Sequence, residues 1–203
     1  MITSVVLMDG RHGKERNPMM LLSRSRTLEL AVLVADRLGL EDHDRGHIES
    51  AALFHDVGKV AIPDEILDKP GPLTGEEWAV VRTHTIRGQE LLAKAGGVPD
   101  DVGTIVRATH ERWDGLGYPD GLSGPSIPLA ARIISCCAAF KAMTTKRSYR
   151  EAMSQEVALR ELVDHAGTQF DPHVVKTVIA AIRTSLRSPG GDRRPDRVGA
   201  RSA

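Results

Sequence analysis

The chain has 203 residues, of which 41% are hydrophobic, and its formal net charge at pH 7 is +0. This length allows one domain with a terminal tail, and the balanced charge excludes a protein drawn to nucleic acid or to a membrane by its overall charge. No apolar run reaches the ~18–20 residues that cross a bilayer, and the N-terminal apolar run is too short for a secretory signal. We therefore expect a cytoplasmic protein with neither a nucleic-acid nor a membrane partner.

Aromatic residues make up only 3% of the chain, so the core must be built from Leu, Val, Ile and Ala, which suits packed helices. The two cysteines, Cys136 and Cys137, are adjacent in the sequence. Neighbouring cysteines rarely form a disulfide with each other, and a structural zinc site needs a wider spacing. We expect both residues to be reduced thiols inside the core.

The first part of the chain predicts a poorly ordered segment followed by helices. Residues 1–22 combine a short apolar run with charged and turn-forming residues. Apolar residues then recur at helical spacing over 28–38 and 44–57, which predicts two helices. The segment 62–73 contains three prolines, which favour an ordered loop over a regular element.

The second part predicts further helices and no sheet. Thr74 followed by Glu77 has the spacing of a capping box and predicts a helix over 74–95. Similar patterns predict helices over 100–109, 128–143, 154–166 and 172–186. The tail, 187–203, is rich in Pro, Gly and Arg, which favours disorder. We therefore predict an all-α helical bundle whose single domain covers 23–186.

A group of histidines and acidic residues indicates a metal site. His55 and Asp56 stand at the end of a mostly apolar stretch, and burying both is costly unless their polar atoms are satisfied. His84 in a following helix and the pair His110–Glu111 add further donors, and such residues can converge on a metal ion in the core of a bundle. The alternative is that each histidine is satisfied on its own.

Four motifs together resemble the HD-GYP domain family. They are H-D-V-G-K from His55, the segment from Ile62 to Trp78, His110–Glu111 with G-L-G-Y-P-D-G-L, and A-M-T-x-x-R-x-Y-R from Ala142. The resemblance covers about 22–186 and implies an all-helical HD fold extended by C-terminal helices. It also implies a site for two or three metal ions, often iron, that hydrolyses the bacterial second messenger cyclic di-GMP or a related cyclic dinucleotide. In this family the GYP loop is associated with contacts to diguanylate cyclase domains.

The resemblance also implies roles for individual residues. The implied metal ligands are His55, Asp56, His84 and His110, with Asp56 bridging two ions, and the implied catalytic residues are Asp56 and Lys59. The implied substrate-binding residues are Lys59, Gly117, Tyr118, Pro119, Arg147 and Arg150. Lysine and arginine suit anionic phosphates. The alternatives are a purely structural turn at the Gly-Tyr-Pro segment and solvated or helix-end charges at the two arginines.

Several ligands that the family pattern would supply are absent. The first-helix histidine corresponds to Ser23, and a glutamate that occurs one turn earlier corresponds to Met19. The first of two paired histidines is Thr109, and two late aspartates are replaced by Ala138 and Lys141. An alanine cannot bind a metal ion, and a lysine repels one.

Grouping these losses by metal position predicts an incomplete site. One position keeps only His55 and Asp56, whereas the other keeps Asp56, His84 and His110. Two histidines and one aspartate can still hold one divalent ion, and we expect Fe or Mn, with Zn as an alternative. The sequence thus predicts a cyclic di-GMP phosphodiesterase-like signalling protein with weak or lost hydrolysis. The alternatives are a non-catalytic regulator that binds a cyclic dinucleotide or docks to a diguanylate cyclase, and a mononuclear HD phosphohydrolase.

Overall fold

The computed structural model describes residues 19–146 and 151–187. These residues form helices and short 3-10 turns with no strand among them, and one isolated bridge pairs Ala166 with Phe170. The all-α prediction is therefore confirmed. No helix in the described ranges is both long and apolar enough to span a bilayer. Residues 1–18 of the segment predicted to be poorly ordered and residues 188–203 of the predicted disordered tail lie outside the described residues. The prediction was wrong for 19–22, which belong to α2, and for Arg187, which ends α10.

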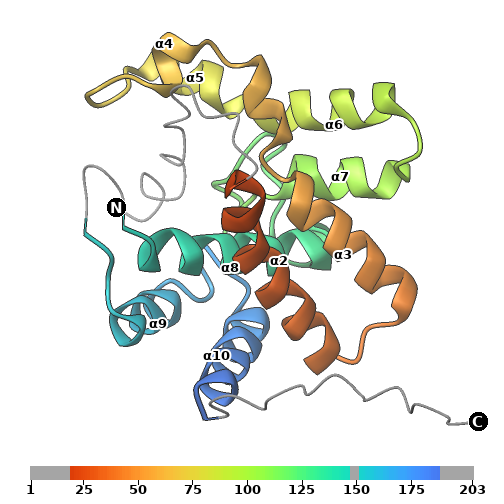
Figure 1. The fold of residues 1–203 in the computed structure, drawn as a ribbon, viewed down its shortest axis with the longest axis vertical. Helices are drawn as coiled ribbons and strands as arrows, with labels where there is room; N and C mark the ends of the chain where they lie inside the picture. The colour runs from red at the N-terminus through yellow and green to blue at the C-terminus, as the bar shows by residue number, and fades with distance from the viewer. Residues whose placement is uncertain (1–18, 147–150, 188–203) are drawn as a thin grey trace, which may run out of the picture.

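The helices follow one another along the chain as Figure 1 shows. The first half has α2 (Met19–Arg37), α3 (Asp42–Phe54), η1 (Val57–Ala61), α4 (Asp64–Leu67), α5 (Gly75–Arg82) and α6 (His84–Ala95). The second half has α7 (Asp100–Ala108), η2 (Gly124–Ser126), α8 (Leu129–Thr144), α9 (Gln155–Asp164) and α10 (Pro172–Arg187). Helices α7 to α10 match the predicted ranges closely. Helix α2 begins earlier than predicted, and the segment 62–73, predicted as a loop, contains the short helix α4.

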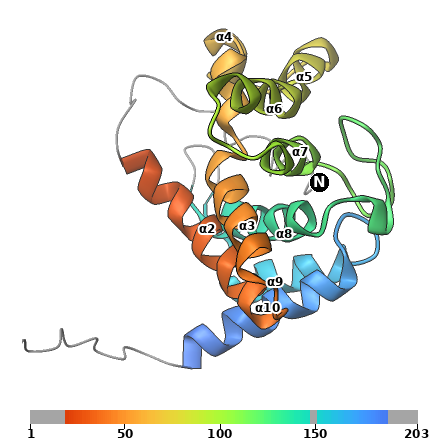
Figure 2. The ribbon, with the colours of Figure 1, turned by 90° about the vertical axis from the view of Figure 1, so that its right-hand side faces the viewer.

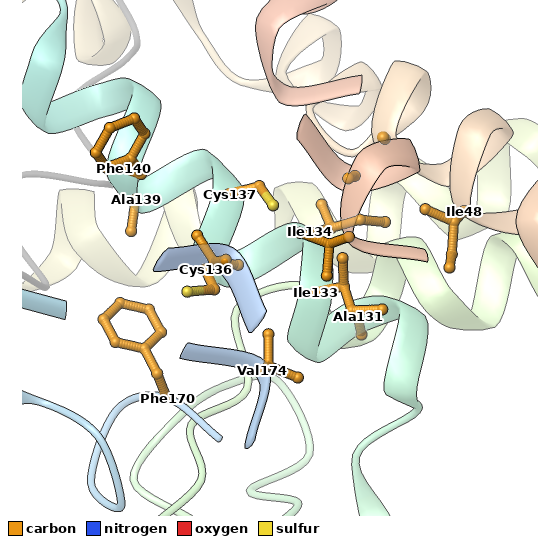
Figure 3. Close-up of a cluster of buried hydrophobic side chains, with 14 of the residues drawn as sticks. Ile48, Ala131, Ile133, Ile134, Cys136, Cys137, Ala139, Phe140, Phe170 and Val174 are labelled. Atoms are coloured by element: carbon orange, nitrogen blue, oxygen red, sulfur yellow. The ribbon is translucent and has the colours of Figure 1, made fainter. Parts of the chain in front are cut away.

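Helix α8 runs through the middle of the molecule, as the two views in Figure 1 and Figure 2 show. It packs against α2, α3, α9 and α10, and its buried residues include Ile133, Ile134, Cys136 and Cys137 (Figure 3). Both cysteines are free, buried thiols, as predicted, and burial raises the pKa of each. Both cysteines belong to the hydrophobic core against which the surrounding helices pack.

Helix α3 ends at Phe54, earlier than predicted, and the chain passes through Asp56 into η1. There η1 lies directly against the first turn of α6. A Cβ atom on Gly58 would lie 1.9 Å from the carbonyl oxygen of His84, so only glycine allows this approach. The contact brings the turn that follows Asp56 beside the histidine that begins α6.

The single helix predicted from Thr74 is in fact two helices, because the chain breaks at Thr83 between α5 and α6. The Thr83 hydroxyl donates to the carbonyl of Val80 at 2.7 Å, a local bond of the kind that competes with helix continuation. The predicted capping box of Thr74 and Glu77 is present, with both of its hydrogen bonds formed. The break makes His84 the first residue of α6, where its side chain faces the core.

We predict that Gly58→Ala destabilises the fold by about 1–3 kcal/mol, because the added methyl group overpacks a backbone contact. Urea denaturation followed by circular dichroism measures the change. Gly46→Ala is the matched control, since Gly46 lies within α3 and a Cβ there meets nothing within 4 Å. That variant should be neutral or more stable by up to about 1 kcal/mol. Equal stability of the two variants would contradict the role of Gly58.

Candidate metal site

Three residues from different parts of the chain meet in one group. Asp56 follows α3, His84 begins α6, and His110 follows α7. Each offers one ligand atom, and these atoms all lie within 4.8 Å of one another. The sequence prediction placed these same residues at one metal position, and the structure brings them together as a candidate metal site.

Backbone carbonyl groups orient two of the predicted histidine ligands. The Nδ1 atom of His84 lies 2.8 Å from the carbonyl oxygen of Val81, and that of His55 lies 2.7 Å from the carbonyl oxygen of Ala52. A carbonyl only accepts a hydrogen bond, so each Nδ1 carries a proton and Nε2 is the ring nitrogen that remains to bind a metal ion. The Nε2 atom of His84 is buried and has no hydrogen-bond partner among the described residues.

His110 and Tyr118 pack together beside His84. The rings of His110 and Tyr118 are stacked with centroids 5.1 Å apart and planes at 5°, while His84 meets His110 edge-on at 4.9 Å. The Nε2 of His110 and the hydroxyl of Tyr118 are buried without a hydrogen-bond partner in the described ranges. Burial and the charge of Asp56 raise the pKa of Tyr118 well above its usual value. Several unsatisfied polar atoms therefore face one small region, which is costly without a ligand.

The charges around the group keep its donors ready for a cation. Burial opposes ionisation of Asp56, but Lys59, His55 and His84 outweigh it and hold the pKa of this carboxyl group well below its usual value. Lys59, itself buried, places its Nζ 2.9 Å from an oxygen of Asp56. Burial, reinforced by Lys59, lowers the pKa of His84 to about 4. Burial and His84 lower the pKa of His110 well below its usual value.

These protonation states fit a divalent metal ion. At neutral pH the group offers one carboxylate and two neutral imidazoles, and metal ligands must be deprotonated in this way. Such a set suits Fe, Mn or Zn. His55 lies outside the group of three. Its Nε2 is 3.6 Å from Oδ2 of Asp56, whereas Lys59 lies beside Oδ1.

The positions where the family resemblance implies further ligands offer no second complete donor set among the described residues. Ala138 lies on α8 and has no donor atom. The Thr109 hydroxyl is buried and donates to the carbonyl of Val106 at 2.8 Å. Ser23 lies on α2. His43, in the first turn of α3, is exposed at the far end of that helix from Asp56.

Glu111, which the sequence pattern grouped with the possible metal donors, lies outside the group of three and holds the Gly-Tyr-Pro loop with its buried carboxylate. Glu111 accepts hydrogen bonds from the backbone N–H groups of Asp120 at 2.7 Å and Gly121 at 3.1 Å. A Cβ on Gly117 would lie 2.3 Å from the backbone nitrogen of Arg112, so the loop folds tightly over the chain that follows His110. In the sequence, the only sign of a special role for Glu111 is its position directly after the metal-ligand candidate His110.

The predicted substrate-binding residues have different positions relative to the group. Lys59 lies at it, paired with Asp56. Tyr118 and Pro119 are joined by a cis peptide bond, and the Tyr118 ring packs on His110. The loop therefore supports a metal-ligand candidate in addition to any contact with substrate. Residues 147–150, which include both predicted arginines Arg147 and Arg150, lie outside the described residues.

Comparison with known proteins identifies the family. The model of the family described as "HD domain" matches residues 14–174. The chain belongs to the HD domain family. This HD chain is 43% identical over 155 residues to the cyclic di-GMP phosphodiesterase response regulator RpfG of Xanthomonas campestris, a match that covers 76% of this chain and 41% of that protein. It is 39% identical over 160 residues to the 3′3′-cGAMP-specific phosphodiesterase 2 of Vibrio cholerae, covering 75% of this chain and 31% of that protein.

Solved structures share the fold of this HD domain. One is the cyclic GMP-AMP-specific phosphodiesterase V-cGAP3 of Vibrio cholerae, with a TM-score of 0.66, 19% identity, and coverage of 91% of this chain and 48% of that one. Another is Bd1817, an HDGYP protein of Bdellovibrio bacteriovorus, with a TM-score of 0.64 and 22% identity. This match covers 79% of the present chain and 51% of Bd1817. The family and the helical fold predicted from the sequence are confirmed. The chain spans less than half the length of the two curated relatives named above.

We predict that Mn²⁺ raises the thermal unfolding temperature of the wild type, because an ion that binds only the folded state stabilises it by about 2.7 kcal/mol at 100 times its Kd. Asp56→Asn and His84→Gln should abolish this metal-dependent shift, whatever their unfolding temperatures without metal. His43→Ala is the control, since this exposed imidazole should not affect the shift. A full shift in Asp56→Asn would show that the ion binds elsewhere.

We predict that Glu111→Ala lowers stability by about 1–3 kcal/mol, because two loop amides lose their buried acceptor. Glu111→Gln keeps an amide oxygen in the position of Oε1, which accepts both bonds, so most of the stability should return. Urea denaturation of the two variants provides the comparison. Equal losses in both would mean that the charge of Glu111, rather than its hydrogen bonds, stabilises the loop.

Proposed function

We propose that this HD domain is a cyclic di-GMP phosphodiesterase-like protein of bacterial second-messenger signalling, in which hydrolysis is weak or lost. The observation that carries the proposal is the single group of Asp56, His84 and His110 beside Lys59. Its relatives are phosphodiesterases of cyclic di-GMP and of 3′3′-cGAMP, which supports a cyclic dinucleotide as the ligand. A cytoplasmic location remains a prediction from the sequence.

Asp56, His84 and His110 would hold one divalent ion, with Fe or Mn preferred and Zn as the alternative. When bound, such an ion supplies Lewis acidity toward a phosphoryl oxygen and toward water. Asp56 contributes the negative charge, and the neutral imidazoles of His84 and His110 contribute lone pairs. Lys59 lies close enough to Asp56 to share its ammonium charge with a phosphate oxygen. Tyr118 keeps the His110 ring in place by stacking.

The same residues give a reason for slow hydrolysis. Enzymes with two metal ions stabilise both the attacking and the leaving oxygen of a phosphodiester. Among the residues that the structure describes, only one complete donor group is found, and Ala138 provides no ligand on α8. The leaving oxygen would therefore lack the second cation that such enzymes use.

A non-catalytic regulator is the second candidate. The Gly-Tyr-Pro loop is held in place by Glu111, and it exposes 78% of Leu116 at its surface. An exposed, large apolar side chain on a well-held loop suits contact with a partner protein, and a diguanylate cyclase domain is the partner that we propose. This candidate needs cyclic-dinucleotide binding or docking, but no turnover.

We predict that the purified chain, loaded anaerobically with Fe or Mn, holds at most one ion per chain and hydrolyses cyclic di-GMP slowly. Elemental analysis gives the metal content, and chromatography of the nucleotides gives the turnover. A variant with Ser23→His, Thr109→His and Ala138→Asp should bind more metal and hydrolyse faster, because it regains the missing donors. Two ions and fast turnover in the wild type would contradict the proposal.

Calorimetry with cyclic di-GMP distinguishes the two candidates. Binding of cyclic di-GMP without turnover supports a ligand-binding regulator. Absence of binding contradicts a cyclic-dinucleotide site and leaves protein docking as the function of the domain.

A further inference from the structure

An arginine that the sequence analysis did not single out stands beside the candidate metal site. Arg82 ends α5, two residues before His84. Its guanidinium carbon lies 5.6 Å from the centroid of the Tyr118 ring, and the same ring stacks on His110. Arg82 is exposed, whereas His84 is fully buried. Arg82 is therefore accessible to solvent while its guanidinium group lies over the Tyr118 ring.

The charge of Arg82 has no carboxylate partner within residues 19–146 and 151–187. The arginines of α6 and α7 are paired: Arg87 with Glu90 at 3.0 Å, and Arg107 with Asp120 at 2.7 Å. Lys59 lies inside the site beside Asp56, where in the proposed function it serves the phosphate at the metal group. An arginine that is held by an aromatic ring but not neutralised is well placed to bind an external anion.

A cyclic dinucleotide presents two phosphodiester groups, and the candidate metal group with Lys59 is compact enough to engage only one of them. On the basis of the proposed function, we propose that Arg82 binds the second phosphodiester, which is not cleaved. Arginine suits this role because its planar fork of N–H donors matches phosphate oxygens. Arg82 would then make the site prefer ligands with two phosphates over ligands with one.

A purely structural role for Arg82 makes a different prediction. If the guanidinium served only to press Tyr118 onto His110, removing it would disturb a metal-ligand candidate. Metal affinity would then fall, and every phosphate ligand would be affected to the same extent. The binding role leaves metal affinity unchanged and affects only ligands that reach Arg82.

The test compares Arg82→Ala with the wild type, both as the full chain loaded with Mn²⁺. Calorimetry with cyclic di-GMP should show affinity reduced by about tenfold or more, the effect of losing a charge-assisted hydrogen bond. Binding of 3′,5′-cyclic GMP, which has one phosphodiester, should change little. Arg82→Lys should recover part of the cyclic di-GMP affinity. Arg87→Ala is the matched control, because this nearby exposed arginine is paired with Glu90.

Three outcomes would overturn the assignment. If Arg82→Ala binds cyclic di-GMP as tightly as the wild type, Arg82 does not contact the ligand, and the proposed function still stands. Equal losses for cyclic di-GMP and cyclic GMP, or a loss of Mn²⁺ affinity, indicate a structural role for Arg82. Failure of the wild type to bind cyclic di-GMP rejects the proposed ligand itself, and the second-phosphate role with it.

Discussion

Gly58 and His84 meet through their backbones, and this contact sets how closely Asp56 can approach the histidines. No side chain stands between η1 and α6 at this point, because a Cβ on Gly58 would lie 1.9 Å from the carbonyl oxygen of His84. Asp56 and Lys59 lie on either side of Gly58 in the sequence. A larger residue would separate the carboxylate from the imidazole as well as strain the fold, so stability and metal binding depend on the same glycine.

The charges at the site balance one another without an ion. The ammonium group of Lys59 lies 2.9 Å from the Asp56 carboxylate, and His84 and His110 are neutral at physiological pH because burial lowers their pKa. A cluster of several carboxylates would repel itself when empty. Ala138 and Lys141, the positions where the family resemblance implies two aspartates, add no negative charge that could hold a second cation. The group that remains is compatible with zero or one ion.

The sequence predicts the helices well where apolar periodicity is strong and local breaks are absent, as in α7, α8 and α10. It does not predict the break at Thr83, because apolar residues keep helical spacing on both sides of it. Resemblance of motifs identifies Asp56, His84 and His110 as ligand candidates. It does not show that Tyr118 packs on His110 or that Arg82 lies over Tyr118, because both contacts join segments far apart in the chain.

The two histidines oriented by carbonyl groups receive that orientation from helix ends. The last carbonyl groups of an α-helix have no partner within the helix, and here those of Ala52 and Val81, in the last turns of α3 and α5, accept from the imidazoles of His55 and His84. Because the acceptor is backbone, no side-chain substitution at Ala52 or Val81 deletes it. A carboxylate or hydroxyl that oriented these rings could be lost through one side-chain substitution, whereas these two carbonyl groups cannot. The orientation of both rings therefore depends on where α3 and α5 end rather than on a second layer of side chains.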